Sequence, residues 1–339
     1  MTPDTITEHR VTMAGHETFY LAAGLKDGPM VILLHGWPEL SLSWRHQLPC
    51  LASLGFRAIA PDMRGYGGSS VYPQHEDYAQ EKIVADMIQL LAALGRDRAI
   101  WVGHDWGSPV AWNIAAHHPE ICQAVANLCV PYRSVELGLD ALIALVDRTV
   151  YPIEKFPAGQ WEYMRFYEEN FASAQAEMEA DVAATLRVLF RAGSPESVGK
   201  PSPTSRVRHN GGWFRGERPP DLPLDENVLA PRDHHIYATT LARNGFFGPN
   251  SWYMNHASNA DYAKTAVNGG VLEMPVLFLA ASYDVTCETI TSRLAAPMAD
   301  YCRDLTTRTV ASGHWMAQEK PVEVNAALVH WLATSVPKT

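Results

Sequence analysis

The chain is organised around the stretch WVGHDWGS at residues 101–108. An apolar run precedes it, and a helical pattern follows from Ser108 to His118. The order small, variable, acidic, variable, small between a strand and a helix is typical of a nucleophile elbow, a tight turn that holds one side chain above a sheet edge. Glycine is needed at positions 103 and 107 because a Cβ atom would clash where strand and helix cross. The sequence therefore predicts that Asp105 stands at the tip of such a turn.

An aspartate at this tip suits one kind of chemistry. A carboxylate is ionised at neutral pH without help from a base, and the N-terminus of the following helix favours negative charge. Attack on an amide or ester carbonyl would give a high-energy anhydride, whereas attack on a saturated carbon gives an alkyl ester, a workable covalent intermediate. Asp105 therefore indicates displacement at carbon, with an epoxide oxygen or a halide as the leaving group. The alternative is an ordinary Gly-Asp-Gly turn with a solvated carboxylate.

Length and composition describe an ordinary globular chain of 339 residues, 47% of them hydrophobic, with a formal net charge of −10. The acidic balance argues against a nucleic-acid partner, which would normally need a basic face. Five cysteines without metal-ligand spacing favour reduced, buried thiols in a cytoplasmic protein that binds no metal. The first residues lack the apolar core of a signal peptide. No apolar run approaches the roughly 20 residues that a membrane span needs.

Strand and helix patterns alternate through the first third of the chain. The continuous apolar run Met30–Leu34 is typical of a parallel strand covered on both faces. This alternation predicts right-handed crossovers and an open, mostly parallel α/β sheet. The other expected strands are two within residues 8–22, then Phe56–Ala60, Arg98–Val102 and Ala124–Val130, and the helices are Leu42–Leu54, Tyr78–Leu94 and Ser108–His118.

The alternation stops at about Tyr132. From there to Asn255 the chain shows helical patterns and loops without a clear strand, including a long loop at 193–231 rich in Pro, Gly and Arg. We therefore predict an α/β-hydrolase core of residues 1–131 and 259–339, interrupted by a helical cap of residues 132–258. A cap over the carboxyl edge of a parallel sheet would enclose a pocket. Strands are expected again at Met274–Ala280 and Leu305–Val310, with a last helix at Val322–Leu332.

A general base and its orienting acid are expected later in the chain, in the order acid and then histidine. Asp284 and His314 follow the last two expected strands, so both can converge on the elbow. Because Asp105 needs no deprotonation, His314 is free to activate the water that hydrolyses the ester. Asp284 would hold the imidazole tautomer and offset its positive charge. Glu288 or Asp300 could take the place of Asp284, and a histidine chosen blindly from the 14 is more often structural than catalytic.

The stretch HGWP at residues 35–38 fits a loop that supplies an oxyanion hole. The backbone N–H of Trp37, together with that of Trp106, could hold the charge that develops when water attacks the Asp105 ester. A cis peptide before Pro38 would fix this turn. The alternative is an ordinary Gly-Pro turn.

Two aromatic stretches of the cap supply candidate acids. WEYMRFY at 161–167 contains Tyr163, and FFGPNSWY at 246–253 ends in Tyr253. A tyrosine hydroxyl can hydrogen-bond an epoxide oxygen and donate its proton as charge develops. Tyr167 lies one helical turn from Tyr163 and could point the same way. The alternative is packing, because the chain has 13 tyrosines.

Together these residues resemble the α/β-hydrolase-fold epoxide hydrolases of the soluble and microsomal type. The resemblance covers nearly the whole chain. It implies a cap with two oxirane-binding tyrosines, a vicinal diol product and no metal or organic cofactor. Tyr253 matches the second family tyrosine closely, and Tyr163 matches the first with a looser local pattern. The resemblance rests on five stretches: HGWPE at 35–39, DMRGYGGS at 62–69, GHDWG at 103–107, GFFGPNSWY at 245–253 and GHW at 313–315.

The expected substrates are a small apolar epoxide and water. Asp105 would attack an oxirane carbon while Tyr163 and Tyr253 protonate the oxygen, and water activated by His314 would then hydrolyse the ester. Either the cap or the core could present a face for a homodimer. The residues expected to line the pocket are His35, Pro38, Trp252 and Trp315, with Trp37 and Trp106.

Two other functions remain open. A haloalkane or haloacid dehalogenase would share the elbow, the histidine and the cap, but such enzymes usually carry Asn after the His-Gly pair, where this chain has Trp37. Some chains of this fold are non-catalytic receptors, since fold alone does not fix function. A receptor has no reason to retain nucleophile, base, orienting acid and oxyanion turn together.

Overall fold

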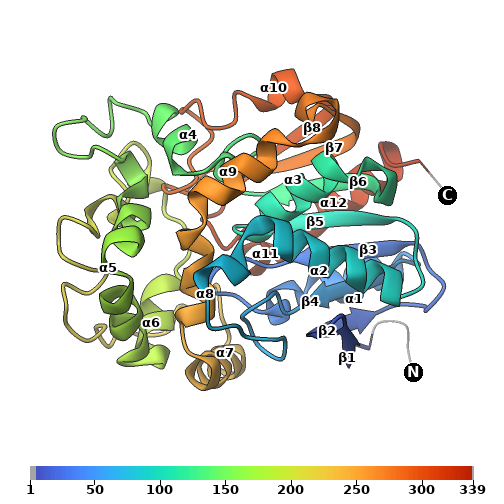
Figure 1. Cartoon of the computed structure of the whole chain (residues 1–339), viewed down its shortest axis with the longest axis horizontal. Helices are drawn as coiled ribbons and strands as arrows, with labels where there is room; N and C mark the ends of the chain where they lie inside the picture. The colour runs from blue at the N-terminus through green and yellow to red at the C-terminus, as the bar shows by residue number, and fades with distance from the viewer. Residues whose placement is uncertain (1–4, 338–339) are drawn as a thin grey trace.

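The computed structural model describes residues 5–337 and places one mixed sheet at its centre (Figure 1). The strand order is β1-β2-β4-β3-β5-β6-β7-β8. Strand β2 pairs antiparallel with β1 and β4, and the remaining pairs are parallel. The strands are β1 (Thr7–Met13), β2 (His16–Ala23), β3 (Met30–Leu34), β4 (Arg57–Pro61), β5 (Ala99–His104), β6 (Cys122–Leu128), β7 (Leu272–Ala281) and β8 (Cys302–Val310). The mostly parallel sheet of the α/β-hydrolase fold is therefore confirmed.

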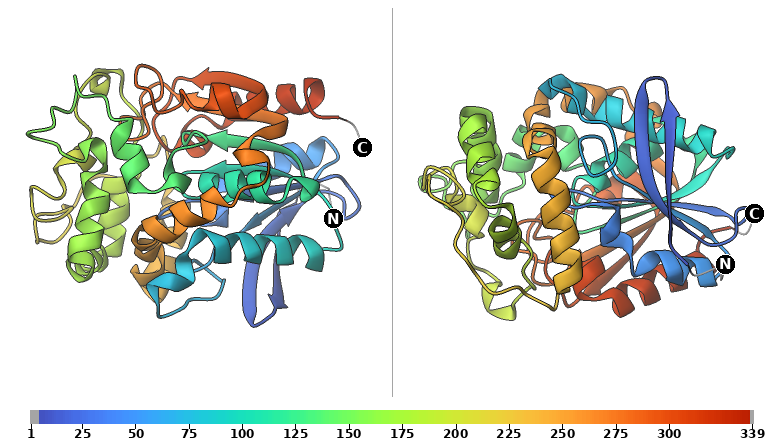
Figure 2. Two further views of the ribbon diagram at one scale, coloured as in Figure 1. Left: turned by 45° about the horizontal axis from the view of Figure 1, so that its top comes forward. Right: turned by 90° about the horizontal axis from the view of Figure 1, so that it is seen from below.

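Helices cover both faces of the sheet, which explains the continuous apolar runs of its central strands (Figure 2). Every residue of β3 and β5 is buried. Helices α2 (Gln80–Ala93) and α3 (Gly107–His117) pack together on one face, where α3 contacts β5 and β6. Helices α1 (Gln47–Ser53) and α12 (Pro321–Thr334) pack together on the other face.

The segment between β6 and β7 contains no strand and forms a helical layer beyond the sheet (Figures 1 and 2). Its long loop, 193–231, holds two short 3-10 helices, Pro195–Ser197 and Pro203–Arg206. Helix α9 (His256–Lys264) straddles the boundary predicted at residue 258, and the three-part division stays a prediction. The helices before it are α4 (Leu139–Ala144), α5 (Glu162–Glu179), α6 (Val182–Leu189), α7 (Pro231–Asn244) and α8 (Phe247–Ser251).

Some local expectations need correction. The single helix predicted for residues 42–54 is a 3-10 turn, Ser41–Trp44, followed by α1. Pro49 explains the break, because proline is tolerated in the first turn of a helix and not in its interior. Tyr78 ends a separate 3-10 turn before α2. All five cysteines are free, but Cys50 is only half-buried. Within residues 5–337, no helix combines the length and the apolar character needed to cross a membrane.

Candidate active site

Asp105 stands at a sharp turn between β5 and α3. Its backbone φ of 49° lies in the left-handed region, which is costly for a residue with a Cβ atom. The flanking glycines make the turn possible. A Cβ atom on Gly103 would lie 2.2 Å from the side chain of Asn127, and one on Gly107 would lie 2.1 Å from the carbonyl oxygen of Leu34. The turn therefore has the geometry expected of a nucleophile elbow.

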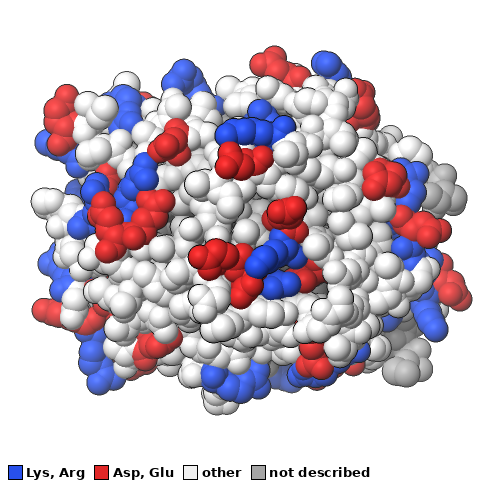
Figure 3. All heavy atoms as spheres, viewed as in Figure 1, with Lys and Arg blue, Asp and Glu red and all other residues white. Residues whose placement is uncertain are grey.

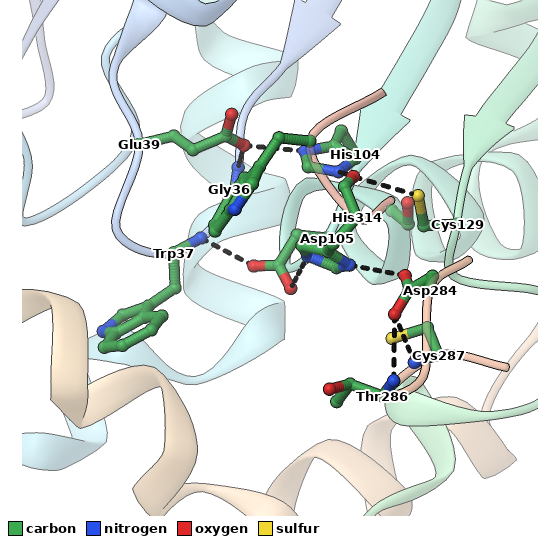
Figure 4. A network of polar contacts seen from close by, with 12 residues as sticks. Gly36, Trp37, Glu39, His104, Asp105, Cys129, Asp284, Thr286, Cys287 and His314 are labelled. Atoms are coloured by element: carbon green, nitrogen blue, oxygen red, sulfur yellow. Dashed lines mark hydrogen bonds and ion pairs between the residues drawn. The ribbon is translucent and has the colours of Figure 1, made fainter. Parts of the chain in front are cut away.

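The structure brings Asp105, His314 and Asp284 into one hydrogen-bonded line (Figure 4). Nε2 of His314 lies 3.2 Å from Oδ2 of Asp105, and Nδ1 lies 2.6 Å from Oδ2 of Asp284. The other Asp284 oxygen accepts hydrogen bonds from the backbone N–H groups of Thr286 and Cys287. Asp284 is thus held from its own loop, and both nitrogens of the imidazole face a carboxylate.

Electrostatics favour a charged His314 in this arrangement. Burial lowers the pKa of His314, but the charge of Asp284 and the hydrogen bonds to both carboxylates outweigh it and raise the pKa well above the ordinary value. Burial raises the pKa of Asp284, whereas the charge of His314 and its hydrogen bond bring it below the ordinary value. The arrangement therefore favours the protonated form of His314, between the side chains of Asp105 and Asp284.

The loop after β3 approaches the nucleophile closely. The backbone N–H of Trp37 donates to Oδ1 of Asp105 at 2.6 Å, and the Trp37–Pro38 peptide is cis. A Cβ atom on Gly36 would lie 2.3 Å from Oδ1 of Asp105 and 2.6 Å from the backbone nitrogen of Trp106, so only glycine fits there. The Trp37 and Trp106 amides thus converge beside the Asp105 carboxylate.

Two tyrosines from the segment between β6 and β7 lie near the Asp105 carboxylate. Tyr163 comes from α5 and Tyr253 from the 3-10 turn Trp252–Met254, and their ring centroids are 5.5 Å apart. Neither hydroxyl has a hydrogen-bond partner within residues 5–337, while both residues line the cavity that Asp105 lines. Burial raises the pKa of both phenols well above the ordinary value, and the charge of Asp105 adds to the shift. Both therefore stay protonated and able to donate.

The cavity has a volume of about 430 Å³ and lies between the core and the cap loop. Its wall is mostly apolar near the nucleophile, where Trp37, Trp213 and Trp315 contribute. Trp213 stacks on Trp37 at 5.7 Å between ring centroids. This volume suits a small organic ligand. Trp213 is an aromatic neighbour that the sequence did not indicate, whereas Tyr167, which was expected to point the same way as Tyr163, stacks on Tyr253.

Four residues expected in the pocket do not line this cavity: His35, Pro38, Trp106 and Trp252. His35 is fully buried, and its Nε2 accepts a hydrogen bond from the backbone N–H of Met63, so it braces the loop instead. Trp252 is 1% exposed and donates to the carbonyl of Arg64 behind the site. His35 and Trp252 thus use their polar ring atoms for hydrogen bonds within the protein core.

Sequence reasoning also missed a buried ion pair below the elbow (Figure 4). Glu39 Oε2 lies 2.7 Å from His104 Nδ1, and both residues are 1% exposed. Glu39 also accepts from the backbone N–H of Gly36 at 3.2 Å and from Gln318 at 3.1 Å. His104 Nε2 contacts the carbonyl oxygen of His314 at 2.8 Å. The pair therefore joins three segments: the loop after β3 that contains Gly36, the turn at Asp105, and the loop that carries His314.

Metal binding at this site would compete with the hydrogen bonds already described. Two groups offer ligand atoms within 4.8 Å of one another: His104, Cys129 and His314, and Asp284, Cys287 and His314. Both depend on His314, whose two ring nitrogens already contact carboxylates. A cation there would displace the contacts that orient the imidazole.

Comparisons with known proteins agree with this geometry. Residues 29–192 match the alpha/beta hydrolase fold family. The chain is 37% identical over 336 residues to epoxide hydrolase A of Mycobacterium tuberculosis, covering 96% of this chain and 97% of that protein. It is 33% identical over 309 residues to bifunctional epoxide hydrolase 2 of Sus scrofa, covering 91% of this chain. The chain spans about half the length of that relative, 52%.

Solved structures give the same result. Epoxide hydrolase A from Mycobacterium thermoresistibile superposes with a TM-score of 0.80 at 32% identity, covering 97% of this chain and 99% of that one. An epoxide hydrolase from an endophytic Streptomyces superposes with a TM-score of 0.79 at 30% identity, covering 97% and 95%. The likeness extends through core and cap alike. This chain belongs to the epoxide hydrolase family of the α/β-hydrolase fold.

Proposed function

We propose that this protein hydrolyses small apolar epoxides to vicinal diols through an alkyl ester on Asp105. The observation that carries the proposal is the pair of unpartnered hydroxyls on Tyr163 and Tyr253, which share one cavity with the Asp105 carboxylate. An oxirane seated between them would meet a nucleophile on one side and proton donors on the other. This arrangement suits in-line opening of the ring.

In the first step Asp105 attacks an oxirane carbon, and the carbon–oxygen bond breaks. The developing alkoxide takes a hydrogen bond and then a proton from a cap tyrosine. Tyrosine is a suitable donor because the alkoxide is far more basic than a phenolate. A hydroxyl without a hydrogen-bond partner in an apolar wall costs free energy. This free energy is recovered when the epoxide oxygen accepts hydrogen bonds from the two hydroxyls.

In the second step His314 acts as a base, because formation of the ester changes which charge state of the imidazole is favoured. Esterification removes the negative charge of Asp105, which lies 3.2 Å from the imidazole in the resting site. Loss of an opposite charge at this distance lowers the pKa of a histidine. This fall in pKa lets His314 give up its proton, and the tyrosinate left by the first step takes up a proton in turn. The neutral imidazole then accepts a proton from a water molecule as that water attacks the ester, Asp284 balances the imidazolium that forms, and the amides of Trp37 and Trp106 hold the tetrahedral oxyanion. When this intermediate collapses, the leaving diol oxygen takes a proton from the imidazolium, and the freed Asp105 carboxyl returns its proton to His314.

One contact weighs against the dehalogenase alternative. A dehalogenase stabilises the departing halide with N–H donors. The indole N–H of Trp37, the aromatic donor of the oxyanion loop, already donates to Oδ1 of Asn250 at 3.0 Å. The tyrosine hydroxyls suit an oxygen leaving group better than a halide because they can transfer a proton to it, whereas the indole of Trp106 does not discriminate between the two functions.

The test is the intact mass of a His314→Gln variant exposed to styrene oxide or, separately, to 1-bromobutane. Without its base the ester should accumulate, so we expect a gain of the whole epoxide mass on the peptide that contains Asp105. An Asp105→Ala/His314→Gln double variant is the matched control and should gain nothing. A gain from the bromide alone would refute the epoxide mechanism and support dehalogenation.

The cellular location and the oligomeric state of the protein are proposals as well. A cytoplasmic location and a homodimer are expectations that rest on composition and on the exposed faces of cap and core. Acidic and basic side chains are interspersed on the face shown in Figure 3. This mixed pattern, with the net charge of −10, supports small-molecule substrates over a nucleic-acid partner.

A further inference from the structure

The nucleophile borders two cavities of very different size. The first is the cavity of about 430 Å³ described above. The second holds only about 10 Å³, and Asp105, Tyr163 and Cys287 line both. A cavity needs roughly 10–15 Å³ by this measure to hold one water molecule. The space on the second side of the nucleophile is therefore about the size of one water.

The wall of the small cavity is made of buried side chains. Its remaining residues are all at most 5% exposed: Trp106, Val130, Val135, Trp161 and Met164. They come from the elbow, the segment after β6 and the start of α5. A wall of this kind resists a larger guest, because inserted atoms force strained rotamers or backbone shifts.

Buried carboxylates fix the two cap segments that form this wall. Glu136 accepts hydrogen bonds from the backbone N–H groups of Arg133 and Ser134, in the turn that carries Val135. Glu162 Oε1 accepts from the backbone N–H of Ala158 at 2.6 Å, beside Trp161. Both carboxyl groups are at most 4% exposed. The wall is thus tied to buried polar contacts on both segments, which hold it in place.

The opposite cavity can accept a large group. It extends from Asp105 past Val188 and Leu189 of α6 to the cap loop, where Pro203 and Trp213 line it. In a trans-disubstituted epoxide the two oxirane carbons carry groups that point away from each other. With the oxygen held by the two tyrosines, one group would enter the large cavity and the other would meet the wall of the small cavity.

We propose, on the basis of the proposed function, that this site selects epoxides with a bulky substituent on one oxirane carbon only. Terminal epoxides fit, since the second carbon carries hydrogens. A methyl group on the second carbon would take up all the space that the small cavity offers, and a phenyl group there would be too large for it. The residues that set the limit are Val135, Trp161 and Met164.

Three substrates test this directly in the wild-type protein: styrene oxide, trans-β-methylstyrene oxide and trans-stilbene oxide. All three carry a phenyl group on one oxirane carbon, and they differ in what the second carbon bears: hydrogen, a methyl group or a second phenyl group. One misplaced methylene in an apolar pocket changes kcat/KM by about 10- to 200-fold. We expect kcat/KM to fall in the order given, with trans-stilbene oxide lower than styrene oxide by at least about 100-fold.

Two matched variants test whether the small cavity is the cause of this substrate selectivity. Val135→Ala removes two methyl groups from the small cavity and should raise the ratio of trans-β-methylstyrene oxide to styrene oxide by about 10-fold. Val188→Ala makes the same change in the large cavity, where both substrates place the same phenyl group, so this ratio should stay constant. An equal rise in both variants would overturn the assignment to the small cavity.

The wild-type comparison stands even if a variant fails to fold. Equal kcat/KM for styrene oxide and trans-stilbene oxide would overturn the selectivity and leave the epoxide mechanism in place. Absence of any mass gain in the His314→Gln trapping experiment would instead refute the proposed function. The two failures are therefore distinguishable.

Discussion

Replacing Glu39 by Gln should destabilise the protein strongly, although Glu39 does not line the substrate cavity. The carboxylate is 1% exposed and pairs with His104, which is equally buried. Burial raises the pKa of Glu39, but the charge of His104 outweighs this and lowers it to about 2. Both groups are therefore charged in the folded protein, and the charge of each offsets the free-energy cost of burying the other.

The size of the effect follows from burial and chain length. Removing one partner of a buried ion pair costs about 3–5 kcal/mol, since the other charge is left without compensation. Unfolding entropy is about 2.1 cal/mol/K per residue, which gives roughly 0.7 kcal/mol/K for the 339 residues of this chain. The expected fall in Tm is therefore about 4–7 °C.

The assay is thermal unfolding by differential scanning calorimetry, with Glu17→Gln as the matched control. Glu17 pairs with Arg10 at 2.6 Å, but the two side chains are 43% and 53% exposed. An exposed pair contributes about 0–1 kcal/mol, so the control should shift Tm by roughly 1 °C at most. A Glu39→Gln variant that melts together with the control would refute the argument from burial.

The same substitution should slow turnover. Glu39 accepts a hydrogen bond from Gly36, next to the Trp37 amide that contacts Asp105. Glutamine can still accept this bond, but without the charge. We expect kcat and KM to fall together while kcat/KM changes little, because the effect acts through the position of an amide used during ester hydrolysis, after the ester has formed. Accumulation of the alkyl ester in single turnover would identify the affected step.

Three further outcomes are expected. Tyr253→Phe should slow ester formation by up to about 100-fold, because one phenol remains to protonate the oxygen; an unchanged single-turnover rate would remove Tyr253 from the site. The Tm gap between wild type and Glu39→Gln should be widest between pH 4.5 and 6.5. It should shrink as the pH falls toward the lowered pKa of Glu39 at about 2, and as it rises toward that of His104 at about 10, which the charge of Glu39 raises against burial. Asp105→Asn should lower the pKa of His314 in an NMR titration, because the charge and hydrogen bond of Asp105 are lost, and an unchanged pKa would contradict the charge argument.

The sheet could be predicted because local patterns encode it. Buried parallel strands appear as continuous apolar runs, and β3 coincides with the predicted Met30–Leu34. The elbow was also predictable, since its glycines mark a steric requirement that spans only residues 103–107. Asp284 and His314 could be placed because both follow strands, and the carboxyl ends of parallel strands meet at one edge.

The polar network and the pocket wall could not be predicted in this way. Glu39 meets His104 across 65 positions and Gln318 across 279, so no local pattern links them. The available signal was Glu39 itself, an acid that follows directly on the HGWP turn. Trp252 was assigned to the pocket from composition alone, and the structure shows that its indole donates to a backbone carbonyl behind the wall. An aromatic residue in a cap does not reveal which side its ring faces.

The two ion pairs of this site differ in a way that fits their roles. The Glu39–His104 pair lies away from the cavity, and its charges have no reason to change during turnover. It can therefore hold the three loops in the same relative positions during the whole reaction. His314 lies between two carboxylates, of which only Asp105 is consumed by the substrate. Ester formation therefore removes one of the two charges that keep the imidazole protonated. The pKa of His314 falls, so the imidazole can lose its proton and is available as a neutral base when water must be activated, and hydrolysis restores the carboxylate that favours the charged form. The order of the two chemical steps thus follows from the electrostatics of one imidazole.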